Sequence, residues 1–258
     1  MTAGTPPIRT ALVTGATSGI GEACARRFAA DGARLVLWAR RLDRLTRIAD
    51  SIEAEHGGHA HIARIDVRDR DAVNDAVAAL VDAGDVPHIL VNNAGLASGL
   101  DLAHEADPAD WDAMIDTNIR GLLNVTRAVL PHMIRLGRGH IINIGSTAGH
   151  MTYPRGNVYA ATKAAVKSLT EGLNLDVAGT PIRVSSIDPG YVATEFSVVR
   201  FHGDQERADK VYEGFRPLSP DDVADTIAYV ANLPEHVNIL DLVVMPTAQR
   251  NVYVVDRG

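Results

Sequence analysis

The chain contains a single cysteine and no apolar run that approaches the length of a membrane span. Because Cys24 has no partner in the sequence, no disulfide can form within the chain, which is typical of a reducing compartment. Residues 1–7 have neither the charged nor the apolar segment of a signal peptide, and we expect them to be a flexible N-terminus. These absences predict a cytoplasmic protein with no membrane partner.

Basic surfaces and metal-binding patterns are also missing. The formal net charge is −7 and no basic stripe is interleaved with aromatic residues, so we expect no nucleic-acid partner. The ten histidines are scattered, with no close ligand pair and no partnered cysteines. Since zinc sites need such spacing, the sequence predicts no catalytic metal.

What the chain does have is a regular alternation of short apolar segments with helical patterns. This predicts one α/β domain over residues 1–258, a doubly wound Rossmann fold with a parallel sheet of about seven strands and helices on both faces. Residues 191–218 lack a clear period and are expected to cover the substrate, and 251–258 form a tail. Strands are expected at residues 10–14, 34–39, 60–65, 88–92, 139–145, 182–187 and 241–245.

A glycine-rich turn follows the first expected strand. Gly15, Gly19 and Gly21 belong to the run GATSGIG, which leads directly into a helical pattern. Gly15 permits a tight turn, Gly19 lets the backbone approach a pyrophosphate and Gly21 allows close helix packing, while the first helix amides face the anion. Strand, turn and helix together predict a dinucleotide site.

Arginine stands where an NAD site would carry an acid. Arg40 and Arg41 follow the second expected strand, about twenty residues past the glycines. The planar arginine fork binds phosphate oxygens, so this pair favours the ribose phosphate of NADP over NAD. Arg44 and Arg47 are expected to lie on the solvated face of the next helix.

Tyr159 and Lys163 are four residues apart, one helical turn, so a phenol and an ammonium share a face. A neighbouring cation stabilises the phenolate, which brings proton exchange with a substrate oxygen closer to neutral pH. Lysine is rare in this chain, where most basic residues are arginines, and Lys163 is therefore conspicuous. We interpret the pair as an acid–base group.

Taken in order, these motifs resemble the short-chain dehydrogenase/reductase family over roughly residues 8–250. The remaining members of the set are Asn92-Asn93-Ala94-Gly95 after the fourth strand, Asn118, Ser146 after the fifth strand, and Pro189-Gly190.

The resemblance implies a role for each of four residues. Tyr159 is the general acid toward a carbonyl or the base toward an alcohol, and Ser146 donates a hydrogen bond to the same oxygen. Lys163 lowers the pKa of Tyr159 and holds the nicotinamide ribose, while Asn118 supports a water chain that returns protons. Besides Tyr159, Lys163, Arg40, Arg41 and the three glycines, the expected NADP contacts are Thr17, Ser18, Ile20, Asp66, Val67, Asn92, Ala94, Gly95, Pro189, Gly190, Val192 and Thr194.

The second half of the chain narrows the resemblance. Residues 194–201, 233–239 and 245–247 are similar to the NADP-dependent short-chain 3-hydroxy acid dehydrogenases, which act on serine-like acids. That branch looks related to the sulfoacetaldehyde reductases, so the resemblance implies a small anionic hydroxy acid or aldehyde as substrate. An anion needs a cation, and Arg155 and Arg200 are the arginines best placed by sequence.

Several alternatives were weighed against this interpretation. A hydrolase with Ser146 as nucleophile is excluded, because residue 144 is Ile where a nucleophile elbow needs Gly. A sulfoacetaldehyde reductase forming isethionate, a broad-specificity carbonyl reductase and a catalytically inactive NADP-binding protein remain open. The resemblance also implies a homotetramer, or a homodimer, assembled through helices near 108–135 and 156–178, with the tail reaching a neighbour.

Overall fold

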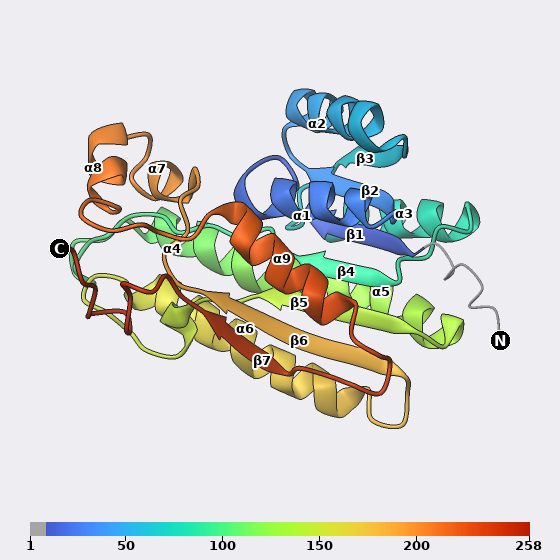
Figure 1. Cartoon of the computed structure of the whole chain (residues 1–258). Helices are drawn as coiled ribbons and strands as arrows, with labels where there is room; N and C mark the ends of the chain where they lie inside the picture. Colours follow the sequence, from blue (N-terminus) through green and yellow to red (C-terminus); the bar gives the residue numbers. More distant parts are fainter. Residues whose placement is uncertain (1–8) are drawn as a thin grey trace.

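The computed structural model describes residues 9–258, which form one parallel sheet of seven strands in the order β3-β2-β1-β4-β5-β6-β7 (Figure 1). The expected flexible segment 1–7 lies outside the described residues. The strand order reverses between β1 and β4, the switch point of a doubly wound fold, which confirms the predicted fold class. The strands are β1 (Thr10–Thr14), β2 (Arg34–Ala39), β3 (Ala60–Arg64), β4 (Ile89–Asn92), β5 (Gly139–Ile144), β6 (Ile182–Pro189) and β7 (Asp241–Val244).

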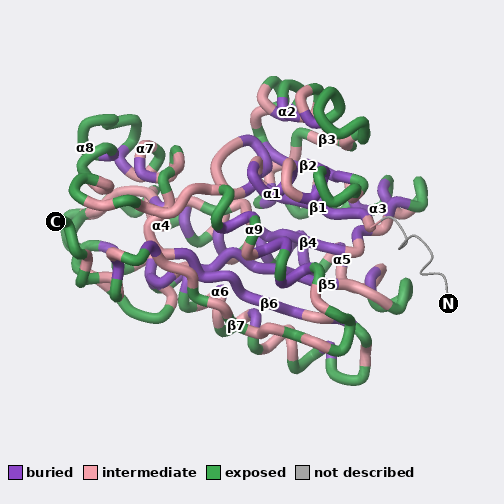
Figure 2. The backbone as a smooth tube through the Cα atoms, in the orientation of Figure 1, coloured by how far each residue is buried: buried purple, intermediate pink, exposed green. Residues whose placement is uncertain are grey.

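Helices cover both faces of the sheet, and each face buries its own apolar cluster (Figure 2). Along β1, Ala11 and Val13 point to one cluster and Leu12 to the other, because successive side chains of a strand alternate. The first cluster lies under α1 (Gly19–Ala30), α2 (Leu42–His56) and α9 (Pro220–Ala231), and the second under α3 (Arg70–Asp82), α5 (Leu122–Leu136) and α6 (Asn157–Asp176).

Residues 191–218 form the two short helices α7 (Phe196–Arg200) and α8 (Gln205–Lys210), and we call this stretch the lid segment. It follows the carboxyl end of β6 and stands at the end of the sheet where the parallel strands end (Figure 1). The tail 251–258 folds back on its own chain, where the guanidinium of Arg257 donates to the backbone oxygen of Glu213 at 2.5 Å. No helix within residues 9–258 has the length and apolar character needed to cross a membrane.

Candidate active site

A cavity of about 410 Å³ opens at the carboxyl ends of the strands, where ligands of this fold bind. The segments that follow the six neighbouring strands β1 to β6 line its floor, and the lid segment lines its outer wall. Most predicted cofactor and substrate residues lie on this lining: Gly15, Thr17, Ser18, Gly19, Ile20, Arg40, Arg41, Asp66, Val67, Ala94, Gly95, Ser146, Tyr159, Lys163, Pro189, Gly190, Val192, Thr194 and Arg200.

The glycine turn has the geometry that its sequence predicted. Gly15 and Gly19 adopt φ of 65° and 53°, a left-handed conformation that favours glycine. A Cβ at Gly21 would come within 2.4 Å of the Gly15 oxygen, so no side chain fits where α1 packs on the turn. Asn93 fixes the turn to the next strand, since its Nδ2 donates to the oxygens of Thr14 at 2.9 Å and Gly15 at 3.2 Å. The first amides of α1 are thereby aimed at the cavity.

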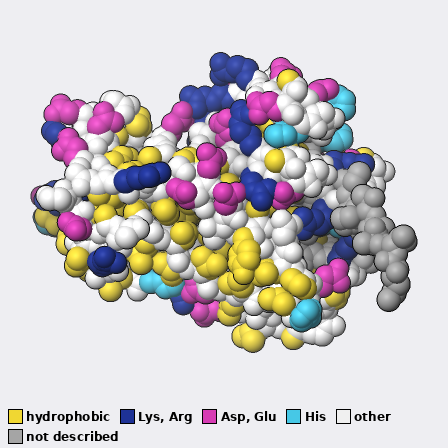
Figure 3. Space-filling view, viewed as in Figure 1, with side chains coloured by type: hydrophobic (Ala, Val, Ile, Leu, Met, Phe, Trp, Pro, Cys, Tyr) yellow, Lys and Arg dark blue, Asp and Glu magenta, His cyan; other side chains and the backbone are white. Residues whose placement is uncertain are grey.

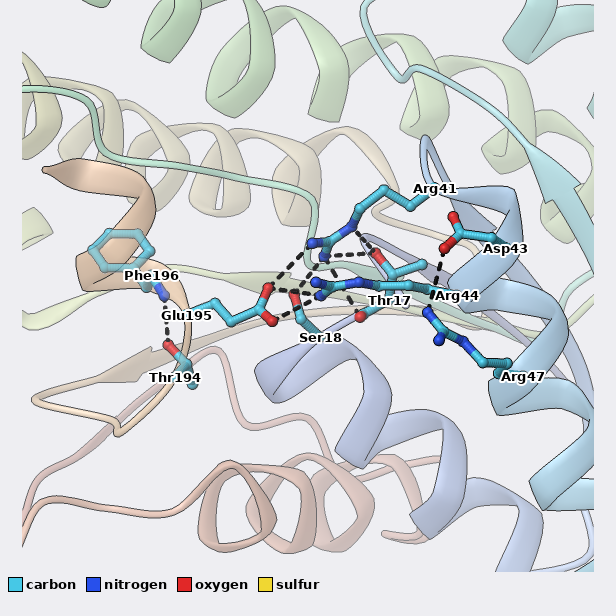
Figure 4. A network of polar contacts seen from close by, with 9 residues as sticks. All are labelled: Thr17, Ser18, Arg41, Asp43, Arg44, Arg47, Thr194, Glu195 and Phe196. Atoms are coloured by element: carbon cyan, nitrogen blue, oxygen red, sulfur yellow. Dashed lines mark hydrogen bonds and ion pairs between the residues drawn. The ribbon is translucent and has the colours of Figure 1, made fainter. Parts of the chain in front are cut away.

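Arg41 is held over the glycine turn (Figure 4). Its Nη2 donates to Thr17 Oγ1 and to Ser18 Oγ, each at 3.0 Å, and its Nη1 donates to Glu195 of the lid segment at 3.1 Å. Arg40 is exposed at the rim, and within residues 9–258 its guanidinium pairs with no side chain. A preformed cationic site therefore stands where the ribose phosphate of NADP was expected.

The two following arginines behave differently from each other. Arg47 pairs with Asp43 at 3.3 Å on the solvated face of α2, as predicted. Arg44 is also partly exposed, and its Nη1 donates to both carboxylate oxygens of Glu195, at 2.7 and 2.9 Å. The sequence could not reveal this partner, because Glu195 is about 150 residues away and only the fold brings the lid segment to α2.

Asn92 was expected to contact NADP, but its side chain lies below the cavity and not on its lining. Its Nδ2 donates to Thr126 Oγ1 and to Asn143 Oδ1, each at 2.9 Å, in the buried layer between β4, β5 and α5. The period of the strand explains the error, because Asn92 still belongs to β4 and the residues that leave the strand, Asn93 and Ala94, reach the cavity instead.

The Ser, Tyr and Lys of the resemblance converge in the middle of the cavity. Ser146 begins the short turn η2 (Thr147–Gly149), where its Oγ accepts from the backbone N–H of Ala148 at 3.1 Å. Tyr159 lies in the first turn of α6 and Lys163 one turn later. Lys163 Nζ is 6.0 Å from the Tyr159 ring centroid and donates to the Ile144 oxygen at 2.7 Å. One hydroxyl, one phenol and one ammonium thus surround the same space.

Asn118 is buried behind these residues, off the cavity lining, in the π-helical turn η1 (Asp116–Gly121) that joins α4 (Pro108–Ile115) to α5. Its Nδ2 donates to the Leu96 oxygen at 2.8 Å and to Thr162 Oγ1 at 3.0 Å, and its Oδ1 accepts from the Leu96 N–H at 2.9 Å. The side chain therefore fixes the loop after β4 to α6. Single π turns within helices are frequent at functional sites.

Burial has the largest effect on the acid–base groups of the site. Burial raises the pKa of Tyr159 to about 12, and the cation that opposes this most is the guanidinium of Arg200, with the Ser146 hydroxyl contributing in the same direction. Burial lowers the pKa of Lys163 to about 8, against the opposing effect of the Asp188 carboxylate. The lowering of the pKa of Tyr159 by Lys163 stays a prediction.

The two candidate anion-binding arginines occupy different places. The Arg200 guanidinium lies 5.1 Å from the Tyr159 ring centroid and 5.4 Å from that of Phe196, and it donates to the Tyr153 hydroxyl. Its Nε is buried without a partner. Arg155 is exposed, at φ 66°, a backbone conformation uncommon for a residue other than glycine, and it lines a small neighbouring pocket that Tyr159 and Arg200 also line. The structure therefore favours Arg200 for contact with the main cavity, and a role for Arg155 stays a prediction.

Sequence reasoning missed two aromatic residues and one polar cluster. Tyr153 and Phe196 line the cavity, with the Phe196 ring packed edge-on against Tyr159 at 5.5 Å. His150, Asp188 and Asp241 bring their polar atoms within 4.8 Å of one another behind Gly145. His150, Asp188 and Asp241 come from three separate parts of the chain, so no local spacing could have revealed their cluster.

Comparisons with known proteins bear on this geometry. A family model described as short chain dehydrogenase matches residues 9–205. The NADP-dependent 3-hydroxy acid dehydrogenase YdfG of Salmonella typhi is 49% identical over 239 residues, covering 92% of this chain and 95% of that protein. Sulfoacetaldehyde reductase 2 of Chromohalobacter salexigens is 48% identical over 248 residues, covering 95% and 98%. The solved closed form of a serine dehydrogenase complexed with NADP⁺ is similar with a TM-score of 0.91 and 47% identity, covering 95% and 98% of the two chains.

Proposed function

The chain belongs to the short-chain dehydrogenase family, and from this premise we propose that it transfers a hydride between NADP(H) and a small anionic hydroxy acid or its carbonyl form. The observation that carries the proposal is the shared cavity. A cationic pair at one end, the Ser146, Tyr159 and Lys163 group in the middle and Arg200 beside it all face the same space.

The cofactor proposed is NADP, and the residues present fit it. The left-handed glycine turn leaves backbone amides free for a pyrophosphate, and Arg40 and Arg41 supply forks for a ribose phosphate. Ile20, Val67 and Thr194 complete the nucleotide walls, and we propose that Asp66 faces the adenine. Relatives over nearly the whole length of the chain are named for NADP dependence.

The chemistry assigned to the protein's own side chains is proton transfer. NADPH, when bound, supplies the hydride that reduces the substrate carbonyl carbon. Tyr159 donates its phenolic proton to the carbonyl oxygen as the alcohol forms, and in the reverse direction the phenolate accepts that proton. Ser146 donates a hydrogen bond to the same oxygen, Lys163 holds the nicotinamide ribose, and Asn118 keeps the loop after β4 in place.

We propose Arg200 as the group that binds the anionic end of the substrate. Its buried Nε has no hydrogen-bond acceptor, and a buried donor without an acceptor costs free energy. A carboxylate or a sulfonate would satisfy it through the arginine fork. The best-supported substrate is a serine-like 3-hydroxy acid, and the similarity to a sulfoacetaldehyde reductase makes the formation of isethionate the second candidate.

Replacing Arg200 by alanine is expected to lower kcat/KM for an anionic substrate by roughly tenfold to a hundredfold, because a charge-assisted hydrogen bond contributes about 1.5–3 kcal/mol. Kinetics with serine, 3-hydroxypropionate, 3-hydroxyisobutyrate and isethionate, each with NADP⁺, measure this loss. Arg207→Ala is the matched control, since it removes an exposed arginine of the same lid segment that lines neither the cavity nor the pocket beside it, and it should leave all four substrates unaffected.

A neutral alcohol or aldehyde of similar size separates charge recognition from a shifted lid. Arg200→Ala should change its turnover little. Equal losses for acid and neutral substrates would remove the anion-binding role of Arg200. Equal wild-type efficiency with acids and neutral ketones would instead identify a broad-specificity carbonyl reductase, and NADP⁺ binding without any turnover would identify a binding protein.

The affinity for NADP⁺ is expected to fall as pH rises above about 8. The pKa of Lys163 is lowered to about 8, so its ammonium is present below this pH and is lost above it. Binding that requires the ammonium then weakens by up to about tenfold per pH unit, while Tyr159 and the ribose phosphate do not titrate in this window. Fluorescence titrations between pH 7 and pH 10 test this, with Lys163→Met as control; a matching decline in that variant would assign the dependence to another group.

We also propose a homotetramer, with a homodimer as the alternative, and a cytoplasmic location. Two separate faces carry exposed apolar side chains. Ile134 of α5 and Leu175 of α6 are exposed on one, and Tyr229 of α9 and Val243 of the edge strand β7 on the other, where hydrophobic side chains gather in Figure 3. Exposed apolar patches mark interaction sites, and two of them suit a tetramer. Light scattering of the intact protein distinguishes the two assemblies.

A further inference from the structure

Glu195 joins the lid segment to the arginines of the cofactor site. It precedes the first residue of α7, and its carboxylate reaches across the cavity mouth toward α2 (Figure 4). One oxygen accepts from Arg44 Nη1 at 2.7 Å, and the other accepts from Arg44 Nη1 at 2.9 Å and from Arg41 Nη1 at 3.1 Å.

The same stretch of the lid segment also touches the catalytic centre. Phe196, the next residue, packs edge-on against Tyr159. Arg200, the last residue of the same helix, places its guanidinium over the Tyr159 ring. On the other side, Thr194 lies against the glycine turn, where a Cβ at Gly19 would meet it at 3.0 Å. Residues 194–200 therefore span from the adenosine end of the cavity to the substrate end.

The arginines retain donors for a phosphate while Glu195 stays in place. Arg41 uses Nε and Nη2 on the glycine turn and Nη1 on Glu195. Arg44 engages only Nη1, and Arg40 pairs with no side chain among residues 9–258. Arg41 and Arg44 share the Glu195 carboxylate. Asp66, the carboxylate near Arg40, is already paired with Arg68 at 2.6 Å. Four guanidinium charges against two carboxylates leave about two positive charges, the amount that a phosphate monoester near neutral pH would balance.

We propose that Glu195 is a positioning residue that latches the lid segment to the arginines of the ribose phosphate site, so that NADP favours lid closure more than NAD does. A phosphate bound by Arg40 and by the unused donors of Arg44 would hold the Arg44 fork in the orientation that Glu195 needs, and a fork that is already ordered binds more tightly. The inference rests on the proposed NADP-dependent function, and it adds that the ribose phosphate improves substrate binding as well as cofactor binding.

The effect is expected to be moderate, because all three side chains are partly exposed, at 36–46%. Exposed ion pairs contribute about 0.2–1 kcal/mol each, and two of them share Glu195. Glu195→Gln should therefore raise the KM for the acid substrate with NADPH or NADP⁺ by about threefold to tenfold. With NADH or NAD⁺ the KM should change little, and the dissociation constant of NADP⁺ alone should increase by no more than the same factor, because NADP binding and lid closure are reciprocally linked.

Hydrogen exchange supplies a readout that needs no turnover. In the wild type, NADP⁺ at saturation should slow amide exchange in residues 196–210 more than saturating NAD⁺ does. Glu195→Gln should remove this difference, and Arg44→Gln should remove it as well, with the double variant no worse than either single one. Asp43→Asn is the matched control: it deletes a carboxylate from the same helix and frees Arg47, yet should leave exchange and KM unchanged.

Several outcomes would overturn the latch. A Glu195→Gln variant whose acid KM is unchanged, lowered, or raised equally with both cofactors would do so, as would equal protection of residues 196–210 by NADP⁺ and NAD⁺. Failure of the proposed function has a different signature, namely a wild type that turns over no hydroxy acid with NADP⁺. Because the exchange experiment depends only on cofactor binding, it decides the latch even in that case.

Discussion

Tyr159→Phe is expected to lower kcat by about 10²- to 10⁴-fold while leaving the affinity for NADPH nearly intact, as loss of a general acid does. Burial keeps the pKa of Tyr159 at about 12 in the free protein, so the side chain is a neutral phenol near pH 7 and carries the proton that a carbonyl oxygen needs. Phenylalanine retains the ring that packs against Phe196, so the variant removes the proton without removing the packing.

Single-turnover measurements of NADPH oxidation, combined with NADPH titrations by fluorescence, separate chemistry from binding. Tyr153→Phe is the matched control, because it deletes a second phenol from the same cavity, one that accepts from Arg200. We expect it to raise the KM for an acid and to leave kcat largely unchanged. Near-normal kcat in Tyr159→Phe would transfer the proton-donor role to another residue of the cavity.

The fold could be predicted because its signals are local. An apolar run bounded by glycine or charge, followed by a helical pattern, identifies a buried parallel strand wherever it occurs. All seven strands were found in this way, and the main difference in their bounds is that β6 continues to Pro189. The glycine turn could also be predicted, because the steric restrictions that require its three glycines arise mostly from residues close in sequence.

Site residues were harder to predict at the ends of strands and helices, where a shift of one residue changes the direction of a side chain. Asn92 and Asn93 are neighbours, yet one belongs to the strand and is buried while the other leaves it and reaches the cavity. Arg155 lies four residues before Tyr159, a helical spacing, but α6 begins only at Asn157, so the two side chains do not share a helix face. Spacing arguments fail at such boundaries.

Long-range pairs could not be predicted from one sequence. The bonds between Glu195 and Arg44, and between Arg200 and Tyr153, depend on how the lid segment returns over the sheet. Residues 191–218 lack the period that predicts an element, so their path was unknown and so were their partners. The charged residues of α2 can be read from the sequence. The partner of Arg44, however, lies in a segment much farther along the chain, whereas Arg47 pairs within its own helix.

Replacing both Arg40 and Arg41 by alanine is expected to reduce the preference for NADP over NAD by about 10²-fold or more, because each charge-assisted bond to a phosphate contributes roughly 1.5–3 kcal/mol. The two single variants should differ. Arg40 pairs with no side chain in residues 9–258, so Arg40→Ala should weaken NADP binding alone. Arg41 also holds Thr17 and Ser18 at the glycine turn, so Arg41→Ala should weaken the binding of both cofactors.

The ratio of kcat/KM for NADPH to that for NADH, measured at one ionic strength, isolates the phosphate contribution from general losses. Arg47→Ala is the matched control, since it removes an arginine of α2, the helix that follows Arg41, and this arginine pairs with Asp43 and does not line the cavity. If Arg47→Ala lowered the ratio as far as Arg40→Ala did, the preference would arise from the total positive charge of α2. A loss confined to Arg40 and Arg41 would instead mean that their forks contact the phosphate directly, because a diffuse field does not distinguish arginines that lie within a few residues of one another.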